Sequence, residues 1–295
     1  MKKRVLNISQ NVVIYVFLIV MGFVFLFPLL KMLSMSMMTS EDLVNPLVNW
    51  FPYEFSMENY QKAVNVLGYG ETLWTTIYVS MLPAFFQTLT CSLVGYGLAR
   101  FPFKGRKIVF GLVLATFIIP SQITMIPQFL MYKDLGVLYS LNAYLLPAIF
   151  GQGFKSSIFI LIFYNFCAQV PVSLIEASEI DGANQAQVFF KITVPMIVPA
   201  YLITFLLSTV WYWNETYLAS LYFGSNIKTL PIKLETFVET FNQMVSASEA
   251  TAGVSANEAI QMAGTFLVIV PLIILYFFTQ RWFVEGIDKS GITGE

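Results

Sequence analysis

The sequence contains no histidine and only two cysteines. Histidine is the side chain best suited to acid–base chemistry near neutral pH, and it is the commonest metal ligand. Its absence therefore argues against a hydrolytic or metal-dependent active site. Cys91 and Cys167 both lie inside apolar stretches, which argues against a structural disulfide or a zinc site. We expect both to be buried, unpaired thiols.

Charged residues are also scarce, at 11% of the 295 residues, whereas soluble domains carry about 25%. Hydrophobic residues make up 57% of the chain, and the mean hydropathy is +0.70. This composition is typical of an integral membrane protein. No basic tract follows Met1-Lys2-Lys3-Arg4, so nothing in the charge pattern points to a nucleic-acid partner.

Long apolar runs predict an all-α integral membrane protein with six transmembrane helices. A helix that crosses a bilayer needs about 20 mostly apolar residues, and the runs show no ten-residue alternation typical of barrel strands. The first run is too long for the apolar core of a signal peptide, so we expect an uncleaved span. The six expected spans are 12–33, 73–99, 108–128, 141–170, 196–222 and 259–284. The fourth contains Gly151-Gln152-Gly153, where we expect it to tilt or break.

Lysine and arginine in short loops indicate the orientation, because they accumulate on the cytoplasmic side. A cytoplasmic N-terminus places the short basic segment ARFPFKGRK (99–107) inside. The outside then receives a sparser set: Lys31, Lys62, Lys133, Lys228 and Lys233. The pattern predicts that both termini are cytoplasmic, which requires an even number of spans.

We expect three parts along the chain. Residues 1–70 would hold the N-terminal tail, the first span and an outer segment, in which the aromatic residues of NWFPYEFSMENYQKAV suit an interfacial helix. Residues 71–285 would form a core of five spans with a polar loop at 171–195, and 286–295 a cytoplasmic tail. The outer connection 224–257 contains MVSASEATAGVSANEA, which is small, polar and typical of a loop.

The most polar stretch inside the core is EASEIDGANQAQVFFKITVPMIVPA, Glu176–Ala200. We expect Pro171 to end the fourth span. Ser173 and Glu176 have the spacing of a capping box, which predicts a helix that starts at Leu174 and stops near Gly182. A second short helix is expected over Gln185–Ile192, and Pro195 should restart the chain into the membrane.

Two interpretations of this stretch follow from the residues alone. Its charges suit an ordinary loop at the membrane surface. Its apolar residues recur beside the carboxylates, which instead suits a helix that docks into a groove on another protein. These apolar residues are Leu174, Ile175, Ala177 and Val188.

The spacing of this stretch resembles the EAA loop of the permease subunits of ATP-binding-cassette (ABC) importers. That pattern is E-A-A, three residues, G, nine residues and I-x-L-P. Glu176-Ala177-Ser178, Gly182 and the ending Ile192-x-Val194-Pro195 match it, with Ser for the second Ala and Val for Leu. The resemblance implies a cytoplasmic coupling helix between spans 4 and 5, in which Glu176 contacts an ATPase and Gly182 provides the bend. The implied contact set is Glu176, Ala177, Ser178, Asp181, Gly182 and Ala183.

Further motifs, from about residue 57 onward, are similar to carbohydrate importers of the maltose-type second-permease family. They are GYGLARFPFKGR, IPSQITMIPQFLMYKDLGVLYSLNAYLLP, WYWNETY, TLPIKLETF and QRWFVEGIDKSGITGE. The chain departs from this family by an apparent insertion at 236–257 and by SGITG near the C-terminus.

Such membership implies a multi-pass protein of the bacterial cytoplasmic membrane that transports an oligosaccharide. The implied partners are a homologous permease subunit, two cytoplasmic ATPase subunits, an extracytoplasmic solute-binding protein and the lipid bilayer. The chain itself would be no enzyme and would bind no cofactor, since ATP and magnesium would reside on the ATPases. GQGFKSS (151–157) agrees with this expectation, because it lacks the spacing of a phosphate-binding loop.

A few polar and aromatic residues near the spans are candidates for a substrate path. Rings and amide or carboxylate groups suit sugars, which present C–H faces and hydroxyls. The candidates are Lys155, Trp213, Asn214, Glu215 and Tyr217. An interfacial aromatic belt and a snorkelling lysine explain the same residues without a ligand.

Other transport classes remain open. An ABC permease for a polyamine or an amino acid would share the EAA-type loop. A secondary transporter would instead show inverted repeats or a chain of ionisable residues inside the membrane, for which only Lys155 and Glu215 are candidates.

Overall fold

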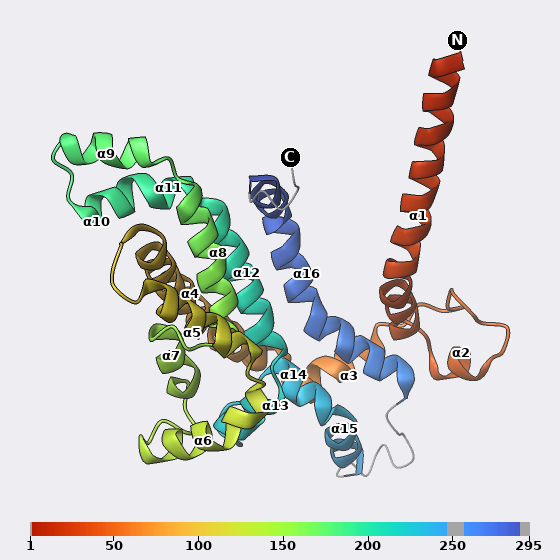
Figure 1. Ribbon diagram of the computed structural model, residues 1–295. Helices are drawn as coiled ribbons and strands as arrows, with labels where there is room; N and C mark the ends of the chain where they lie inside the picture. Colours follow the sequence, from red (N-terminus) through yellow and green to blue (C-terminus); the bar gives the residue numbers. More distant parts are fainter. Residues whose placement is uncertain (1, 247–256, 290–295) are drawn as a thin grey trace. The chain divides into compact units, whose positions relative to one another are not determined.

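The computed structural model describes residues 2–246 and 257–289, and within these ranges every regular element is helical. Contacts divide the chain into two compact units, Met1–Tyr69 with Leu234–Val270 and Gly70–Lys233 with Pro271–Glu295. The helices of both units are drawn in Figure 1. Each unit is described on its own.

The first unit contains one long apolar helix that packs little against the rest of the chain. In α1 the segment Asn11–Ser36 is long and apolar enough to cross a bilayer, and none of its most apolar stretch is buried inside the chain. Its apolar side chains are therefore available to lipid or to a partner. The helices of this unit are α1 (Lys2–Ser36), α2 (Ser40–Val44), α3 (Glu58–Leu67), α15 (Phe237–Ser246) and the first part of α16 (Glu258–Lys289).

The segment after α1 differs from the expected interfacial helix. Within NWFPYEFSMENYQKAV only the part from Glu58 onward is helical, as α3, and the aromatic residues of NWFPYEF lie in a stretch without regular structure between α2 and α3. Pro46 and Pro52 account for the difference, because a proline disfavours the helical conformation of the residue before it and has no N–H to donate. Asn45, before Pro46, is extended with φ −86° and ψ 112°.

This aromatic stretch nevertheless folds back onto the last turns of α1. The Trp50 ring packs edge-on against Phe27, with centroids 5.0 Å apart. Lys31 Nζ lies 5.8 Å from the centroid of the Trp50 ring and donates to the carbonyl oxygen of Asn49 at 2.5 Å. Phe51, in contrast, is 80% exposed. The stretch therefore presents aromatic side chains beside the end of a bilayer-length helix.

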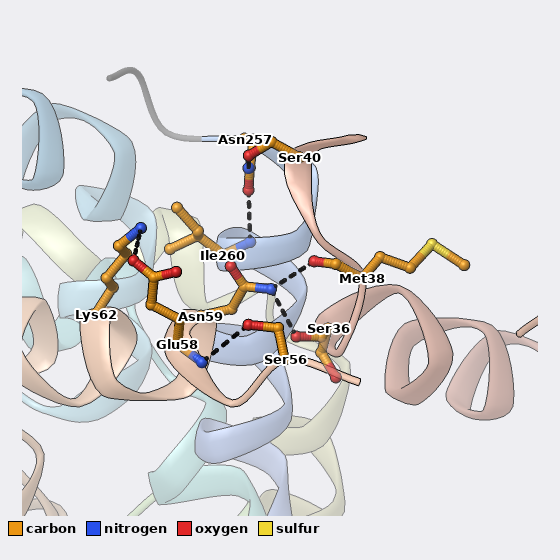
Figure 2. A network of polar contacts seen from close by, with 9 residues as sticks. All are labelled: Ser36, Met38, Ser40, Ser56, Glu58, Asn59, Lys62, Asn257 and Ile260. Atoms are coloured by element: carbon orange, nitrogen blue, oxygen red, sulfur yellow. Dashed lines mark hydrogen bonds and ion pairs between the residues drawn. The ribbon is translucent and has the colours of Figure 1, made fainter. Parts of the chain in front are cut away.

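Asparagine side chains hold the chain around the C-terminal end of α1 in place (Figure 2). The buried Asn59, at the start of α3, donates to the carbonyl oxygens of Ser36 at 3.0 Å and Met38 at 2.8 Å. These carbonyls lie at and just beyond the end of α1, where a helix leaves its oxygens without partners. Asn257 donates to the Ser40 hydroxyl at 3.2 Å and caps the first turn of α16.

The second unit contains most of the long helix α4 (Tyr69–Arg100) and a series of shorter helices. The shorter ones are α5 (Arg106–Ile118), α6 (Ser121–Asp134), α7 (Asn142–Ile149), α8 (Ser156–Gln169), α9 (Val172–Ile180), α10 (Gln185–Val188), the π-helix η1 (Phe189–Thr193), α11 (Val194–Met196), α12 (Val198–Asn214), α13 (Tyr217–Phe223) and α14 (Leu230–Glu235). Cys91 and Cys167 are free thiols in its buried core, which confirms the prediction from the sequence.

Three of the described helices are each long and apolar enough to cross a bilayer as a single helix: Asn11–Ser36, Tyr69–Arg100 and Glu258–Arg281. Three further candidates are pairs of helices bent by 100° (α5 and α6), 70° (α8 and α9) and 76° (Gln185–Met196 and α12). The described chain thus offers from three to six spans. The third expected span, 108–128, is divided between α5 and α6 at Pro120, and Ile119 before this proline is extended at ψ 119°.

The fourth expected span is interrupted where the glycines predicted a weak point. α7 ends at Ile149 and α8 begins at Ser156. Between them, Gly151 has φ 71° and Lys155 has φ 56°. A left-handed conformation costs a residue with a side chain about 1–2 kcal/mol, so the surrounding contacts must hold Lys155 in place.

The fifth expected span is also shorter than its apolar run. α12 ends at Asn214, and α13 begins at Tyr217. Glu215 between them is extended, and its Oε1 accepts from the backbone N–H of Leu218 at 2.9 Å. The carboxylate thereby satisfies a free N–H in the first turn of α13, and the apolar run expected to continue to residue 222 is divided into α12 and α13.

Side-chain contacts fasten the N-terminal part of α4 to α14. The Thr76 hydroxyl oxygen accepts from Leu230 N at 2.8 Å, and Lys233 Nζ donates to Thr72 Oγ1 at 2.8 Å. Burial lowers the pKa of Lys233, and the nearby Glu71 carboxylate opposes that shift.

Candidate functional site

The second unit contains a partly open cavity of about 610 Å³. Its wall is formed by α5, α6, α7, the broken loop after α7, α8, α12 and α13. Apolar side chains such as Leu112 and Phe117 form one part of the wall. Polar side chains form another, including Gln128, Tyr144, Gln152, Lys155, Asn214 and Glu215. A wall of this mixed kind suits a small, partly polar ligand.

Packed tyrosines make the most buried part of the wall. The Tyr144 ring lies 5.3 Å from the Tyr212 ring and 4.9 Å from that of Phe154. Tyr222 donates to Gln128 Oε1 at 3.2 Å. The Tyr144 hydroxyl, in contrast, is buried and has no hydrogen-bond partner among the described residues. A buried polar group left unpaired costs about 1–3 kcal/mol, so a ligand that accepted from this hydroxyl would recover that energy.

A buried glutamine of α4 fixes the broken loop at the edge of the cavity. Gln87 Nε2 donates to the carbonyl oxygen of Phe154 at 2.7 Å and to Ser156 Oγ at 2.9 Å. Gly153 is required here by space, because a Cβ would lie 2.5 Å from Tyr212 Oη and 2.8 Å from Gln87 Oε1. The loop therefore has little freedom, and it places the exposed Lys155 at the cavity wall.

The structure separates the five candidate path residues into two groups. Lys155, Asn214 and Glu215 line the cavity. Trp213 is only 3% exposed and Tyr217 is 64% exposed, and neither lines the cavity. Successive residues of a helix point in different directions, which explains why Asn214 reaches the cavity while its neighbour Trp213 packs away from it.

Sequence reasoning missed several residues of the cavity wall. Gln128, Tyr144, Gln152 and Tyr222 all line it. Each is a polar or amphipathic side chain within or next to an expected span, and such residues in a membrane segment commonly face the protein interior or a water-filled space. That signal was present in the sequence, but it did not say which of these side chains converge.

The polar stretch between the fourth and fifth expected spans forms a hairpin, which we call the polar hairpin (172–188). Figure 1 shows its helices α9 and α10 side by side beyond the ends of α8 and α12. α9 ends at Ile180, and Gly182 follows with φ 87°. The N–H of Ala183 donates to the oxygen of Ser178 at 2.9 Å, and that of Gly182 to Glu179 at 3.0 Å. This is a Schellman turn, and it confirms the helix end predicted at Gly182.

The predicted capping box at Ser173 and Glu176 is wrong. α9 begins at Val172 directly after Pro171, and no side chain caps it. Ser173 already has a helical conformation, whereas a capping residue must lie outside the helix.

A capping box is instead present at the start of α10. Asn184 Oδ1 accepts from Gln187 N, and Gln187 Oε1 accepts from Asn184 N, both at 2.9 Å. The sequence N-x-x-Q carried this signal just as S-x-x-E did. Two candidates of the same kind were present, and local sequence alone did not rank them.

The second arm of the hairpin leads into α12 through an irregular turn. After α10 the chain widens into the π-helix η1, and α12 begins only at Val198, after a bend at Ile197. Pro195 has no N–H to donate to the carbonyl oxygen four residues earlier, which accounts for the loss of regular α-helix here. The second helix expected over Gln185–Ile192 is therefore α-helical only to Val188 and continues through η1 and α11 to Met196.

The exposed surface of α9 carries apolar side chains beside carboxylates. No side chain of α9 is fully buried, and Ile180 is 86% exposed. Only Ile175 packs against the buried core below. The exposed residues include Val172, Leu174, Glu176, Ala177 and Asp181, whereas Ser178 and Ala183 are half-buried. The hairpin is thus a stiff element with an apolar and acidic face that the described chain does not cover.

The described residues form helices as their sole regular elements, three of bilayer length, with a cavity of mixed polarity and a projecting polar hairpin, and this architecture is that of a helical membrane protein. Residues 91–289 match the family model described as "Binding-protein-dependent transport system inner membrane component". The chain belongs to this family.

Relatives and solved structures agree with this assignment. The chain is 30% identical over 281 residues to the arabinooligosaccharides transport system permease protein AraQ of Halalkalibacterium halodurans, covering 92% of this chain and 93% of that protein. It is 28% identical over 288 residues to the polygalacturonan/rhamnogalacturonan transport system permease protein YtcP of Bacillus subtilis, covering 96% and 98%.

The fold is also similar to a chain of a bacterial ABC transporter involved in the import of the acidic polysaccharide alginate. The TM-score is 0.70 at 22% identity, and the match covers 96% of this chain and 98% of that chain. At this identity the likeness concerns the fold alone.

Proposed function

We propose that this chain is the permease subunit of an ABC importer that carries a carbohydrate, in the form of an oligosaccharide, across the bacterial cytoplasmic membrane. The observation that carries the proposal is the polar hairpin: its Schellman turn falls on the glycine of the EAA-like pattern, and α9 presents an uncovered apolar and acidic face. The sugar class rests on relatives whose names give oligosaccharides and polysaccharides as their cargo.

In this proposal the chain crosses the membrane six times and both termini are cytoplasmic. Each bent pair of helices contributes one crossing or part of one, and the core spans 71–285 between a first part at 1–70 and a tail at 286–295. The excess of lysine and arginine in 99–107 supports an inner position for the loop before α5. The polar hairpin then also lies on the cytoplasmic side, between the fourth and fifth spans.

The polar hairpin would dock into a cleft of a cytoplasmic ATPase. Val172, Leu174 and Ile180 supply exposed apolar surface, which is the component that such docking buries. Glu176 and Asp181 lie exposed on the same short helix and its end, where they suit basic groups of the ATPase. The wider contact set includes Ala177, Ser178, Gly182 and Ala183.

ATP and magnesium would bind to two ATPase subunits, and this chain would hold no cofactor. Closure of the ATPases would move the polar hairpin and switch the permease between inward-open and outward-open states. A homologous permease would complete the translocation path, and an extracytoplasmic solute-binding protein would deliver the sugar.

The cavity would take part in the substrate path. Lys155, Asn214 and Glu215 supply charged and amide groups at its wall, and the rings of Tyr144 and Tyr212 supply flat apolar surface. A pyranose presents the matching groups, hydroxyls at its edge and C–H bonds on its face. Trp213 and Tyr217 would act from outside the cavity, the first as buried packing and the second at the surface.

The outer connection 224–257 would contact the solute-binding protein. Its helices α14 and α15 are described, but much of the stretch MVSASEATAGVSANEA lies outside the described residues.

Reconstitution tests the proposed function. The chain is placed in proteoliposomes with its partner permease, the ATPase and the solute-binding protein, and uptake of an arabinooligosaccharide is compared with uptake of a polyamine. The proposal predicts ATP-dependent uptake of the sugar only. Uptake of the polyamine alone would overturn the sugar class, and equal uptake without ATP would overturn the ABC mechanism.

A further inference from the structure

The inner end of α4 carries an arginine that contacts the chain just before the polar hairpin. Arg100, the last residue of α4, donates from its guanidinium to the carbonyl oxygens of Cys167 and Val170. These oxygens belong to the end of α8 and to the residue that follows it. A helix leaves its last carbonyls without partners and carries partial negative charge there. Arg100 supplies both the donors and the opposite charge.

A second residue on the same face of α4 contacts the chain just after the hairpin. Tyr96 lies four residues before Arg100, which places both on one side of the helix. Its ring centroid is 4.8 Å from that of Phe189, the first residue of η1. The inner end of α4 therefore contacts the chain on both sides of the polar hairpin, at Cys167 and Val170 before it and at Phe189 after it.

The packing between α4 and α8 leaves no room for these contacts to slide. A Cβ at Gly95 would lie 2.5 Å from Phe163 Cβ and 2.9 Å from Tyr164 N. The two helices are thus in direct backbone contact beside Tyr96 and Arg100. Closely packed elements of this kind move together or change to another discrete arrangement, rather than deforming continuously.

Further along, α4 is fastened to the broken loop that borders the cavity. Gln87 holds Phe154 O and Ser156 Oγ, and its own Oε1 accepts from Ser208 Oγ of α12 at 3.0 Å. Thr90 Oγ1 donates to the oxygen of Ile149 at 2.9 Å. Gln87 and Arg100 are thirteen residues apart, about 20 Å along a helix that rises 1.5 Å per residue.

We propose that α4 transmits the position of the polar hairpin to the broken loop after α7 (150–155). Arg100 is the positioning residue at the hairpin, and Gln87 is the positioning residue at the loop. The proposal rests on the proposed function, because it requires an ATPase to move the hairpin. To the proposed function it adds the helix, α4, and the two polar attachments through which the movement of the hairpin reaches the cavity.

Replacing Arg100 by glutamine in the full transporter tests the proposal. Glutamine removes the charge and cannot reach both carbonyl oxygens, so the hairpin should still dock and stimulate ATP hydrolysis, but its movement should no longer reach the loop. We expect sugar transported per ATP hydrolysed to fall about tenfold or more, with ATP hydrolysis within about twofold of the unmodified transporter. Arg100→Lys, which keeps the charge, should recover part of the ratio.

Arg106 offers a matched control on the same inner loop. Its guanidinium donates to Ala99 O at 3.2 Å and to Tyr164 Oη at 3.5 Å, and neither acceptor belongs to the hairpin or to the adjoining residues that α4 contacts, Cys167, Val170 and Phe189. Arg106→Gln removes the same charge and should leave the transport ratio unchanged. An unchanged ratio in Arg100→Gln, or an equal fall in both variants, would overturn the proposal.

A second readout follows the loop itself, which keeps the test decisive if transport in the variant is too low to measure. A cysteine at Phe150, which is 74% exposed and does not line the cavity, is labelled with a thiol reagent with and without trapped ATP. The labelling rate should change with ATP in the unmodified background and stay constant with Arg100→Gln. An equal change in both would refute transmission through α4 while leaving the proposed function intact. No change in either would count against the proposed function itself.

Discussion

Replacing Gly182 by alanine probes the turn on which the polar hairpin depends. Gly182 has φ 87°, and a Cβ there would meet nothing within 4 Å. The substitution therefore creates no collision, and its whole cost is the left-handed backbone conformation, about 1–2 kcal/mol for a residue with a side chain. That energy corresponds to a factor of about 5–30 in an equilibrium.

The cost acts on the fraction of molecules whose hairpin has the shape required for docking. Apparent affinity falls in proportion to that fraction. The affinity of the ATPase for membranes that contain the Gly182→Ala transporter should therefore fall by up to about 5- to 30-fold. With Gly182→Asn the affinity of the ATPase should fall less, because asparagine tolerates the left-handed conformation better than alanine does.

Gly105 provides a control with the same strain at another place. It has φ 89°, and a Cβ there would likewise meet nothing within 4 Å, but it lies before α5 and outside the hairpin. The measurement is sedimentation of the ATPase with permease-containing vesicles over a range of ATPase concentrations. Equal losses in Gly182→Ala and Gly105→Ala, or no loss in the former, would refute the reasoning.

Two predictions concern the cavity. Gly153→Ala forces a Cβ to within 2.5 Å of Tyr212 Oη, and overpacking of this kind costs about 1–3 kcal/mol, so the melting temperature of the purified chain should fall; an unchanged value would contradict the close approach. Tyr144→Phe removes a buried hydroxyl that has no hydrogen-bond partner among the described residues. The stability of the chain should therefore stay the same or rise, while sugar transport falls. Unchanged transport would show that the hydroxyl does not contact the substrate.

Features set by neighbouring residues were predictable from the sequence. The end of α9 follows from Gly182, since only a left-handed residue completes the Schellman turn. The break before α8 follows from the glycines at 151 and 153, and the free, buried state of the two cysteines follows from their apolar surroundings. Each of these signals acts over a few residues, so it does not depend on how the helices pack.

Features set by packing were not predictable in the same way. The convergence of Gln128, Tyr144 and Tyr222 on one cavity depends on how α6 and α7 meet α13, which is distant from them in sequence. Hydropathy also predicted continuous helices where the structure has breaks, because an apolar run does not reveal the change of direction at Pro120 or the end of α12 at Asn214. The contacts of Arg100 depend on tertiary structure too, although the charge pattern of the sequence predicts that its loop is cytoplasmic.

A disulfide cross-link tests most directly whether the polar hairpin docks on an ATPase. A cysteine replaces Ala177, which is exposed on α9, and cysteines are placed around the cleft of the candidate ATPase. Leu47→Cys, 78% exposed in the segment proposed to lie outside the cell, is the control. The proposed function predicts a cross-link from Ala177→Cys whose yield changes with ATP, and none from Leu47→Cys. No cross-link from Ala177→Cys in a complex that still transports would contradict it.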